Sequence, residues 1–157
     1  SIYYMFIEKV IVSLNQHRVQ YALVGGYAVS LHGAVRGTVD IDIVIAFNQR
    51  SYINVEKALS SIGLKPRLPV SAEDVFKYRQ EYIKNRNLTA WSFYNPDNPL
   101  EIVDIIITED VKQIKSITKT IKDNKIKIEA IDDLIKMKKK SGRKQDIEDI
   151  KALEKLK

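Results

Sequence analysis

Residues 23–43 read LVGGYAVSLHGAVRGTVDIDI, and this stretch decides the fold class. The mainly apolar residues 20–24 stop at a pair of glycines, as a buried strand would, and residues 27–32 then predict a short helix. Residues 39–46 alternate aspartate with branched apolar side chains, which predicts a second strand. A strand, a glycine turn, a helix and a strand in close succession indicate a mixed α/β (α+β) domain.

The rest of the chain extends this pattern into a mixed sheet with flanking helices and a helical C-terminal part. The sequence patterns predict helices over 2–18, 49–62, 72–83, 131–140 and 144–156, a loop over 64–72, and strands over 88–94, 100–108 and, as two short strands, 117–128. No repeat, low-complexity linker or domain boundary interrupts the sequence. We therefore expect a single domain over 1–157, with a core of about 20–128 and a basic helical part of about 129–157.

The composition excludes several classes of protein. Of the 157 residues, 45% are hydrophobic and 29% are charged, as in a soluble globular protein. The absence of cysteine excludes disulfide frameworks, thiolate zinc sites and a thiol nucleophile. No apolar run approaches the roughly 20 residues that span a bilayer, and residues 1–9 lack the basic start of a signal peptide. We therefore expect a cytoplasmic protein with no membrane partner, and Ser1 in place of methionine predicts that the native start is missing.

The net charge of +6 is concentrated in the C-terminal third. Residues 1–110 carry 11 basic and 12 acidic side chains, whereas residues 111–157 carry 15 basic and 8 acidic ones. This asymmetry indicates a polyanionic partner, either the phosphates of a nucleotide or a nucleic acid. The alternative is that lysine-rich amphipathic helices expose a solvated face.

The glycine pair Gly25-Gly26 lies where a helix is predicted to begin. Glycine lets the backbone approach a ligand closely and adopt positive φ. The unpaired amides at the start of a helix, together with the helix dipole, favour an anion. Glycine pairs are common in turns, so this feature indicates a phosphate site only in combination with others.

Asp40 and Asp42 are a sharper feature. Because they are two residues apart on a strand, their side chains leave the same face, roughly 6.6 Å apart along the chain. Like charges beside a sheet core are unfavourable, and bound Mg²⁺ or Mn²⁺ removes the repulsion. Asp104 lies in the otherwise apolar run 102–108, where an unpaired carboxylate is costly. The three carboxylates predict a divalent-metal site for phosphoryl transfer, and the alternative for the first two is an edge strand with a polar face.

Taken in this order, Gly25-Gly26, Asp40-Ile41-Asp42 and Asp104 resemble the signature of the nucleotidyltransferase superfamily, which has a DNA-polymerase-beta-like fold. The stretches 36–42 and 134–149 further resemble the abortive-phage-infection nucleotidyltransferase toxins and related small bacterial and archaeal proteins. The combined resemblance covers nearly the whole chain.

The resemblance implies an enzyme that transfers a nucleoside monophosphate from a nucleoside triphosphate, such as ATP, to a hydroxyl group and releases pyrophosphate. Two Mg²⁺ or Mn²⁺ ions would take part. By the same resemblance, Asp40 and Asp42 would bind both metals, and Asp104 would bind the catalytic metal and help to activate the hydroxyl. Gly25 and Gly26 would cradle the β- and γ-phosphates.

The resemblance also implies contacts outside the carboxylate triad. Lys138 would reach the triphosphate as a point charge, and Arg36 would pair with a phosphate or with Asp40. Gly26 stands where many family members have serine. The hydroxyl contact to the triphosphate is therefore either missing or supplied by Ser30.

Five other residues have a structural interpretation as well as, or instead of, a functional one. Arg143 and Asp146 form either a structural ion pair or a contact to the nucleotide. His32 is better explained as a packed, hydrogen-bonded core residue than as a metal ligand or general base. Trp91 and Phe93 share one face of a strand and are predicted core residues.

The motifs leave the acceptor open. The toxin-like features favour RNA, such as a tRNA 3′ end, or a protein as the acceptor, with an antitoxin as a further expected partner. A small molecule such as an aminoglycoside is the other acceptor class. The alternative function is a non-catalytic nucleotide- or RNA-binding module, or an antitoxin-type partner protein, with the same fold.

Overall fold

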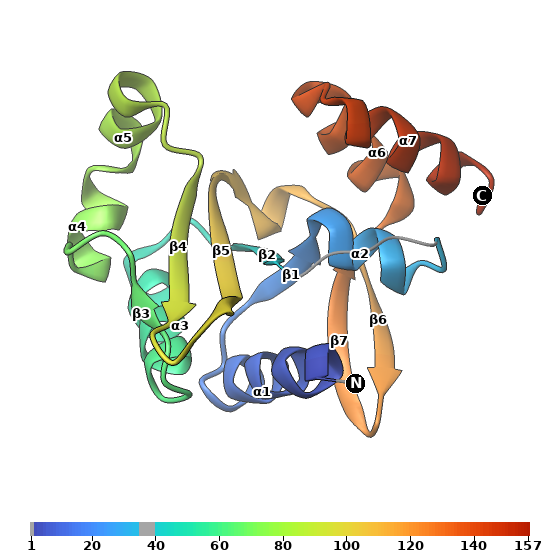
Figure 1. Ribbon diagram of the computed structural model, residues 1–157. Helices are drawn as coiled ribbons and strands as arrows, with labels where there is room; N and C mark the ends of the chain where they lie inside the picture. The colour runs from blue at the N-terminus through green and yellow to red at the C-terminus, as the bar shows by residue number, and fades with distance from the viewer. Residues whose placement is uncertain (1, 35–39) are drawn as a thin grey trace.

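The computed structural model describes residues 2–34 and 40–157 (Figure 1). Within these residues, seven strands form one mixed sheet in the order β3-β4-β5-β2-β1-β7-β6. The strands are β1 (Tyr21–Val24), β2 (Asp40–Ile45), β3 (Lys65–Pro66), β4 (Ala90–Asn95), β5 (Asn98–Asp110), β6 (Ser116–Ile121) and β7 (Asn124–Glu129). The strands that carry the predicted carboxylates, β2 and β5, are therefore neighbours near the centre of the sheet.

Helices flank this sheet throughout the described part of the chain. They are α1 (Ile2–Gln16), α2 (Gly25–Leu31), α3 (Gln49–Ser60), α4 (Ala72–Lys77), α5 (Arg79–Arg86), the 3₁₀-helix η1 (Val111–Gln113), α6 (Ile131–Ser141) and α7 (Lys144–Glu154). Polar N-cap side chains fix where some of these helices begin. At the start of α3, Asn48 Oδ1 accepts a 2.8 Å hydrogen bond from the backbone amide of Ser51. Gly142, with φ 65°, ends α6 and lets the chain turn back into α7.

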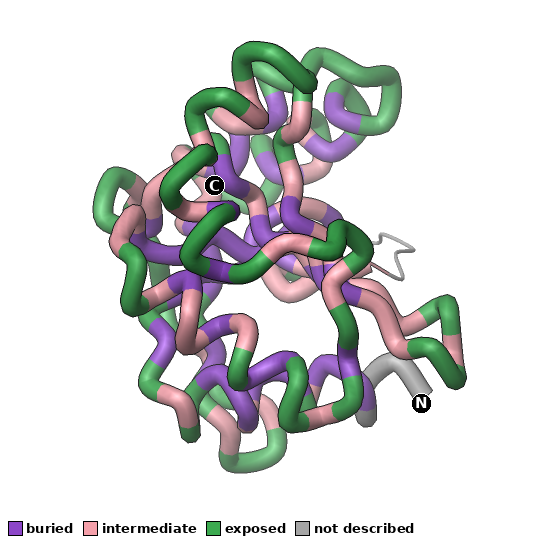
Figure 2. The backbone as a smooth tube through the Cα atoms, turned by 90° about the vertical axis from the view of Figure 1, so that its left-hand side faces the viewer, coloured by how far each residue is buried: buried purple, intermediate pink, exposed green. Residues whose placement is uncertain are grey.

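The two faces of the sheet bury different sets of side chains. One face carries the large core, in which Trp91 and Phe93 of β4 are fully buried and the Trp91 ring stacks on Tyr52 of α3 with ring centroids 5.7 Å apart. This confirms both predicted core residues. The other face carries a smaller cluster that includes Val24 of β1 and Met137 of α6. Figure 2 shows the buried segments running through the middle of the molecule and the exposed ones in its outer turns.

The strand register brings acidic residues from distant parts of the chain side by side. β2 runs antiparallel to β1 and parallel to β5. Asp42 lies opposite Val24 on one side and opposite Asp104 on the other. Because residues opposite each other in a sheet point to the same face, both carboxylates lie on the face that carries the Val24–Met137 cluster.

The predicted mixed sheet with flanking helices and a helical C-terminal part is confirmed. The single helix predicted over 72–83 is wrong, because the chain leaves helical geometry at Tyr78 (φ −100°, ψ 15°) and forms two short helices, α4 and α5. Ala72 and Val75 anchor α4 in the core, whereas α5 has no buried residue along its described length. Tyr82 and Ile83 of α5 pack against the core only as partly buried side chains, so α4 is anchored more deeply than α5. The predicted loop over 64–72 contains the two-residue edge strand β3.

The described helices are all too short or too polar to cross a membrane. The extent of the domain and its division near residue 129 stay predictions.

Candidate active site

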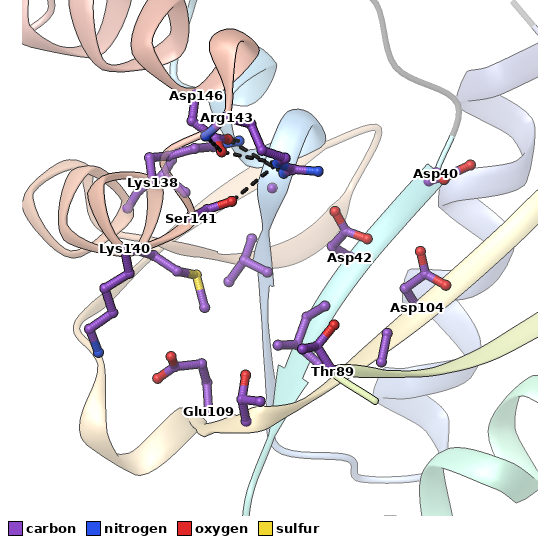
Figure 3. A pocket seen from close by; sticks show the side chains of 17 residues that line it. Asp40, Asp42, Thr89, Asp104, Glu109, Lys138, Lys140, Ser141, Arg143 and Asp146 are labelled. Carbon is purple, nitrogen blue, oxygen red and sulfur yellow. Dashed lines mark hydrogen bonds and ion pairs between the residues drawn. The ribbon is translucent and has the colours of Figure 1, made fainter. Parts of the chain in front are cut away.

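A pocket of about 630 Å³ lies between the sheet and the turn that joins α6 to α7 (Figure 3). Its floor comes mainly from β2 and β5, and its opposite wall comes from α6 and the start of α7. Acidic side chains gather on the floor, whereas Lys138, Lys140 and Arg143 line the wall. The volume is within the roughly 300–1,000 Å³ range of pockets that bind small molecules.

Three carboxylates lie together on the floor of this pocket. Asp42 and Asp104 are opposite each other on neighbouring parallel strands, and the charge of Asp104 acts on the pKa of Asp42. Asp40 lies two residues before Asp42, and all three side chains line the pocket (Figure 3). Ser92 Oγ of β4 donates a 2.6 Å hydrogen bond to Asp104 Oδ1. The fold therefore gathers the predicted carboxylates in one place.

The carboxylate cluster holds negative charge that its surroundings do not offset. Burial, followed by the charges of Asp104 and Asp40, raises the pKa of Asp42 to about 7, and Lys138 opposes only part of this effect. Burial and the charge of Asp104 also raise the pKa of Asp40, against the influence of Arg67. Clustered carboxylates that repel each other favour a bound divalent cation, and Mg²⁺ and Mn²⁺ prefer oxygen ligands.

The cluster is not a ready-made metal cage. In residues 2–34 and 40–157, no three acidic or histidine side chains are grouped so that they could coordinate an ion as they stand. The donor atoms and the raised pKa of Asp42 fit a divalent metal, but coordination by all three carboxylates requires their side chains to rotate.

Gly25 makes room for Asp42 at the start of α2. Its φ of 66° lies in the left-handed region, and a Cβ added to it would lie 2.2 Å from Asp42 Oδ2. No L side chain fits there without displacing the carboxylate. Glycine at position 25 therefore leaves the space that the Asp42 carboxylate occupies, in addition to any contact with a phosphate.

Several predicted residues are not among the described residues that line the pocket. Gly26 is buried in α2, and neither it nor Ser30 is among the described residues that line the pocket. His32 Nε2 lies 2.7 Å from the carbonyl oxygen of Glu129, as expected of a hydrogen-bonded histidine, but the residue is half-buried and not part of the core. Arg36 lies outside the described residues.

Lys138 and Arg143 are held by buried carboxylates. Lys138 Nζ lies 3.2 Å from Asp146 Oδ1 and 2.9 Å from Asp149 Oδ2, and only 7% of the Lys138 side chain is exposed. Arg143 Nε lies 3.0 Å from Asp146 Oδ2, so the ion pair considered from the sequence is present. Because Arg143 also lines the pocket, its structural and ligand-binding interpretations are compatible.

No protein-family model and no curated protein matches this sequence, but solved structures resemble its fold. The lincosamide antibiotic adenylyltransferase LnuA, bound to lincomycin, aligns with a TM-score of 0.65 at 16% identity, over 98% of this chain and 97% of that one. The antibiotic-resistance factor ANT(2'')-Ia aligns with a TM-score of 0.64 at 12% identity, over 95% of this chain and 80% of that one. A nucleotidyltransferase-like protein from Paracoccidioides brasiliensis aligns with a TM-score of 0.57 at 16% identity, over 94% of this chain and 74% of that one. The chain has the nucleotidyltransferase fold.

The nucleotidyltransferase fold is the one that the motif resemblance implied. At identities of 12–16%, it is the fold that these chains share, and the closer resemblance to the phage-infection toxins stays a prediction.

Within the nucleotidyltransferase fold, residues that the sequence did not single out line the pocket or act on the carboxylates that line it. Ser92 binds Asp104, Arg67 acts on the pKa of Asp40, and Glu109 adds a further acidic side chain to the lining. Ser92 has no motif of its own, and its place follows only from the β4–β5 register, which sets it opposite Asp104.

The protein without divalent metal should be less stable at pH 8 than at pH 6. Burial, followed by the charges of Asp133 and Glu109, raises the pKa of Glu129 to about 8, and Asp42 titrates near 7. The folded protein therefore keeps protons that the unfolded chain releases near the ordinary values of 3.8 and 4.5. The free energy of unfolding falls as the pH rises from about 4, and the loss is complete only above about 9. We expect a loss of about 2–4 kcal/mol between pH 6 and 8, measured by urea unfolding in EDTA.

Two variants and a control test whether Asp42 and Glu129 cause this pH dependence of stability. Asp42→Asn and Glu129→Gln should each reduce it, because each removes one group whose folded pKa is raised. Glu148→Gln, at an exposed position on α7, should leave it unchanged. A free energy of unfolding that rises between pH 6 and pH 8 would contradict the charge state assigned to the cluster.

Proposed function

We propose that this protein is a metal-dependent nucleotidyltransferase, which transfers a nucleoside monophosphate from a nucleoside triphosphate to a hydroxyl group and releases pyrophosphate. The observation that carries the proposal is one pocket with an acidic floor and a basic wall. Asp42 and Asp104 repel each other on the floor, and the cations Lys140 and Arg143 line the wall across from them. A polyphosphate with bound divalent ions complements both surfaces, because the ions would contact the acidic floor and the phosphate oxygens would contact the basic wall.

In this proposal Asp40, Asp42 and Asp104 hold Mg²⁺ or Mn²⁺. When bound, the ions neutralise phosphate charge and make the acceptor hydroxyl a better nucleophile. The acceptor oxygen forms a bond to the α-phosphorus, and the bond to pyrophosphate breaks. Asp104 helps to activate the hydroxyl, and Ser92 holds the Asp104 carboxylate in place from β4.

The phosphate contacts follow from the wall of the pocket and from the start of α2. Gly25 lines the pocket and can approach the β- and γ-phosphates. Lys138 contributes positive potential from within its ion pairs, as its effect on the pKa of Asp42 indicates. The contacts expected of Gly26, Ser30 and Arg36 stay predictions.

We favour RNA as the acceptor. Lys139 and Lys140 are exposed near the end of α6, and Lys140 lines the pocket, so these lysines can bind a phosphate backbone. A protein acceptor has no comparable feature in its favour. The second candidate is a small molecule that carries a hydroxyl group, because the similar structures include enzymes studied with adenylyl-2''-tobramycin and with lincomycin.

The toxin resemblance extends the proposal to a cytoplasmic enzyme with an antitoxin as its partner. The neighbouring genes test this part, since a toxin is expected beside its antitoxin. A non-catalytic binding module is the alternative function, but such a module has no need for three like charges around one pocket.

A transfer assay tests the reaction and the acceptor together. The protein is incubated with each α-labelled nucleoside triphosphate, Mg²⁺ and total tRNA. We expect label on the RNA with at least one triphosphate and none once EDTA removes the metal. Parallel reactions contain tobramycin, lincomycin or total protein instead of RNA. Label on an antibiotic alone would move the acceptor to the small-molecule class, whereas no transfer to any acceptor and no release of pyrophosphate would contradict the enzyme.

A further inference from the structure

Arg143 has an exposed side chain whose guanidinium group is held by several hydrogen bonds within the protein. About three quarters of this side chain is accessible (74%), yet its Nε donates to Asp146 Oδ2 at 3.0 Å and to Ser141 Oγ at 3.1 Å. Its Nη2 lies 3.4 Å from Asp146 Oδ1. Long exposed side chains normally sample many rotamers, and ordering one costs entropy. These hydrogen bonds therefore hold the guanidinium in one place before any ligand arrives.

The carboxylate that holds Arg143 is itself rigid. Asp146 has no exposed side-chain surface, and its carboxylate also accepts hydrogen bonds from the backbone amide of Arg143 at 3.0 Å and from Lys138 Nζ at 3.2 Å. Burial favours the protonated acid, but the hydrogen bonds from Arg143, Ser141 and Lys138 keep the pKa of Asp146 well below its ordinary value. Asp146 is thus an ionised, fully ordered support for the turn between α6 and α7.

Lys138 and Arg143 differ in what they can offer to a ligand. Lys138 is almost completely buried, and Asp146 and Asp149 both hold its ammonium group. Arg143 points into the pocket toward Asp42 (Figure 3), and in the described part of the chain no hydrogen bond uses its Nη1. An anion in the pocket can therefore accept a hydrogen bond from Nη1 of Arg143. The ammonium group of Lys138 is already engaged by Asp146 and Asp149.

We propose that Arg143 is the direct phosphate-binding residue of the basic wall and that Asp146 is its positioning residue. This rests on the proposed function, because the ligand is the polyphosphate of the nucleoside triphosphate. A guanidinium presents parallel N–H groups that match phosphate oxygens, and Nη1 is available for this contact. Lys138 then contributes to phosphate binding indirectly, because its contact with Asp146 helps to hold the carboxylate that positions Arg143.

Calorimetric titration with inorganic triphosphate and Mg²⁺, and with ATP and Mg²⁺, tests the role of Arg143. Arg143→Ala should weaken the binding of both probes about 10- to 100-fold, as expected for a lost hydrogen bond between charged groups. Arg143→Lys should recover part of the loss, because it restores the charge without the fork. Lys144→Ala removes the same charge from the next residue, which does not line the pocket among the described residues, and should change binding less than about twofold.

The role of Asp146 needs a double-mutant cycle. Asp146→Asn should weaken triphosphate binding in the unsubstituted protein but add less than about twofold in the Arg143→Ala background. An equal effect of Asp146→Asn in both backgrounds would overturn the positioning role. Should Asp146→Asn fail to fold, the Arg143 variants alone decide the phosphate contact, since their side chain is exposed.

The outcomes separate this inference from the proposed function. If the unsubstituted protein binds neither probe, the proposed function fails and the inference fails with it. If the unsubstituted protein binds and transfers label while Arg143→Ala binds equally well, the inference alone is overturned. Equal losses for Arg143→Ala and Lys144→Ala would also overturn it, because general electrostatic attraction would then explain the binding.

Discussion

Asp104→Asn should lower the rate of nucleotidyl transfer by several orders of magnitude while the protein stays folded. Asparagine has nearly the same shape but carries no negative charge for a metal ion, and loss of metal-ion catalysis has effects of this size. The Oδ1 atom that accepts the hydrogen bond from Ser92 is retained. Because Asp42 loses a like charge beside it, metal-free stability should be unchanged or higher. Single-turnover rates and thermal unfolding measure the two effects.

Glu101→Gln is the matched control for this substitution. Glu101 lies on the same strand, β5, three residues before Asp104 and therefore on the opposite face, where it accepts a 2.8 Å hydrogen bond from Asn95. Neutralising it should change the rate less than about threefold, because it does not contact the reacting groups. If Asp104→Asn retains the activity of the unsubstituted protein, the catalytic proposal is wrong and a binding module becomes the better explanation.

Gly25→Ala should strongly lower the transfer rate and also destabilise the fold. The added Cβ would lie 2.2 Å from Asp42 Oδ2, and the backbone at φ 66° disfavours any residue with a Cβ. Left-handed strain and the displacement of a buried carboxylate together should cost about 1–3 kcal/mol. The transfer rate should fall about a hundredfold or more, because a displacement of about 1 Å in a catalytic group has effects of this size. Urea unfolding and the transfer assay measure the two losses.

Gly63→Ala separates backbone strain from damage to the site. Gly63 also has positive φ, at 90°, but nothing lies within 4 Å of a Cβ added there. It follows α3, away from the residues that line the pocket. This variant should lose a similar strain energy of about 1–2 kcal/mol and keep its activity. Equal losses of activity in both glycine variants would show that the effect at Gly25 is general instability and not displacement of Asp42.

Local physics in the sequence determined most elements of the fold and part of the site. The two-residue period of a strand places Asp40 and Asp42 on one face wherever residues 39–46 lie in the molecule. The apolar run around Asp104 marks a buried strand, in which a charge needs a partner. A positive φ at Gly142 and the apolar spacing on either side of it produce the α6–α7 hairpin close to its predicted bounds. These features depend on neighbours in the chain, so they can be predicted without the tertiary structure.

Only the tertiary structure decided which of these residues meet. Asp42 and Asp104 are 62 positions apart, and their contact depends on the parallel register of β2 with β5. The same register logic places Ser92 beside Asp104, and no local pattern marks that serine. The resemblance implies that Lys138 reaches the triphosphate, and only the packing of α6 against α7 shows that two buried carboxylates surround its ammonium group. Likewise, whether residues 72–83 form one helix depended on packing that buries side chains of α4 more deeply than those of α5. The physical reason is common to these cases: strand pairing, burial and ion pairing act between residues that are close in space, whereas sequence periodicity reports only on residues that are close along the chain.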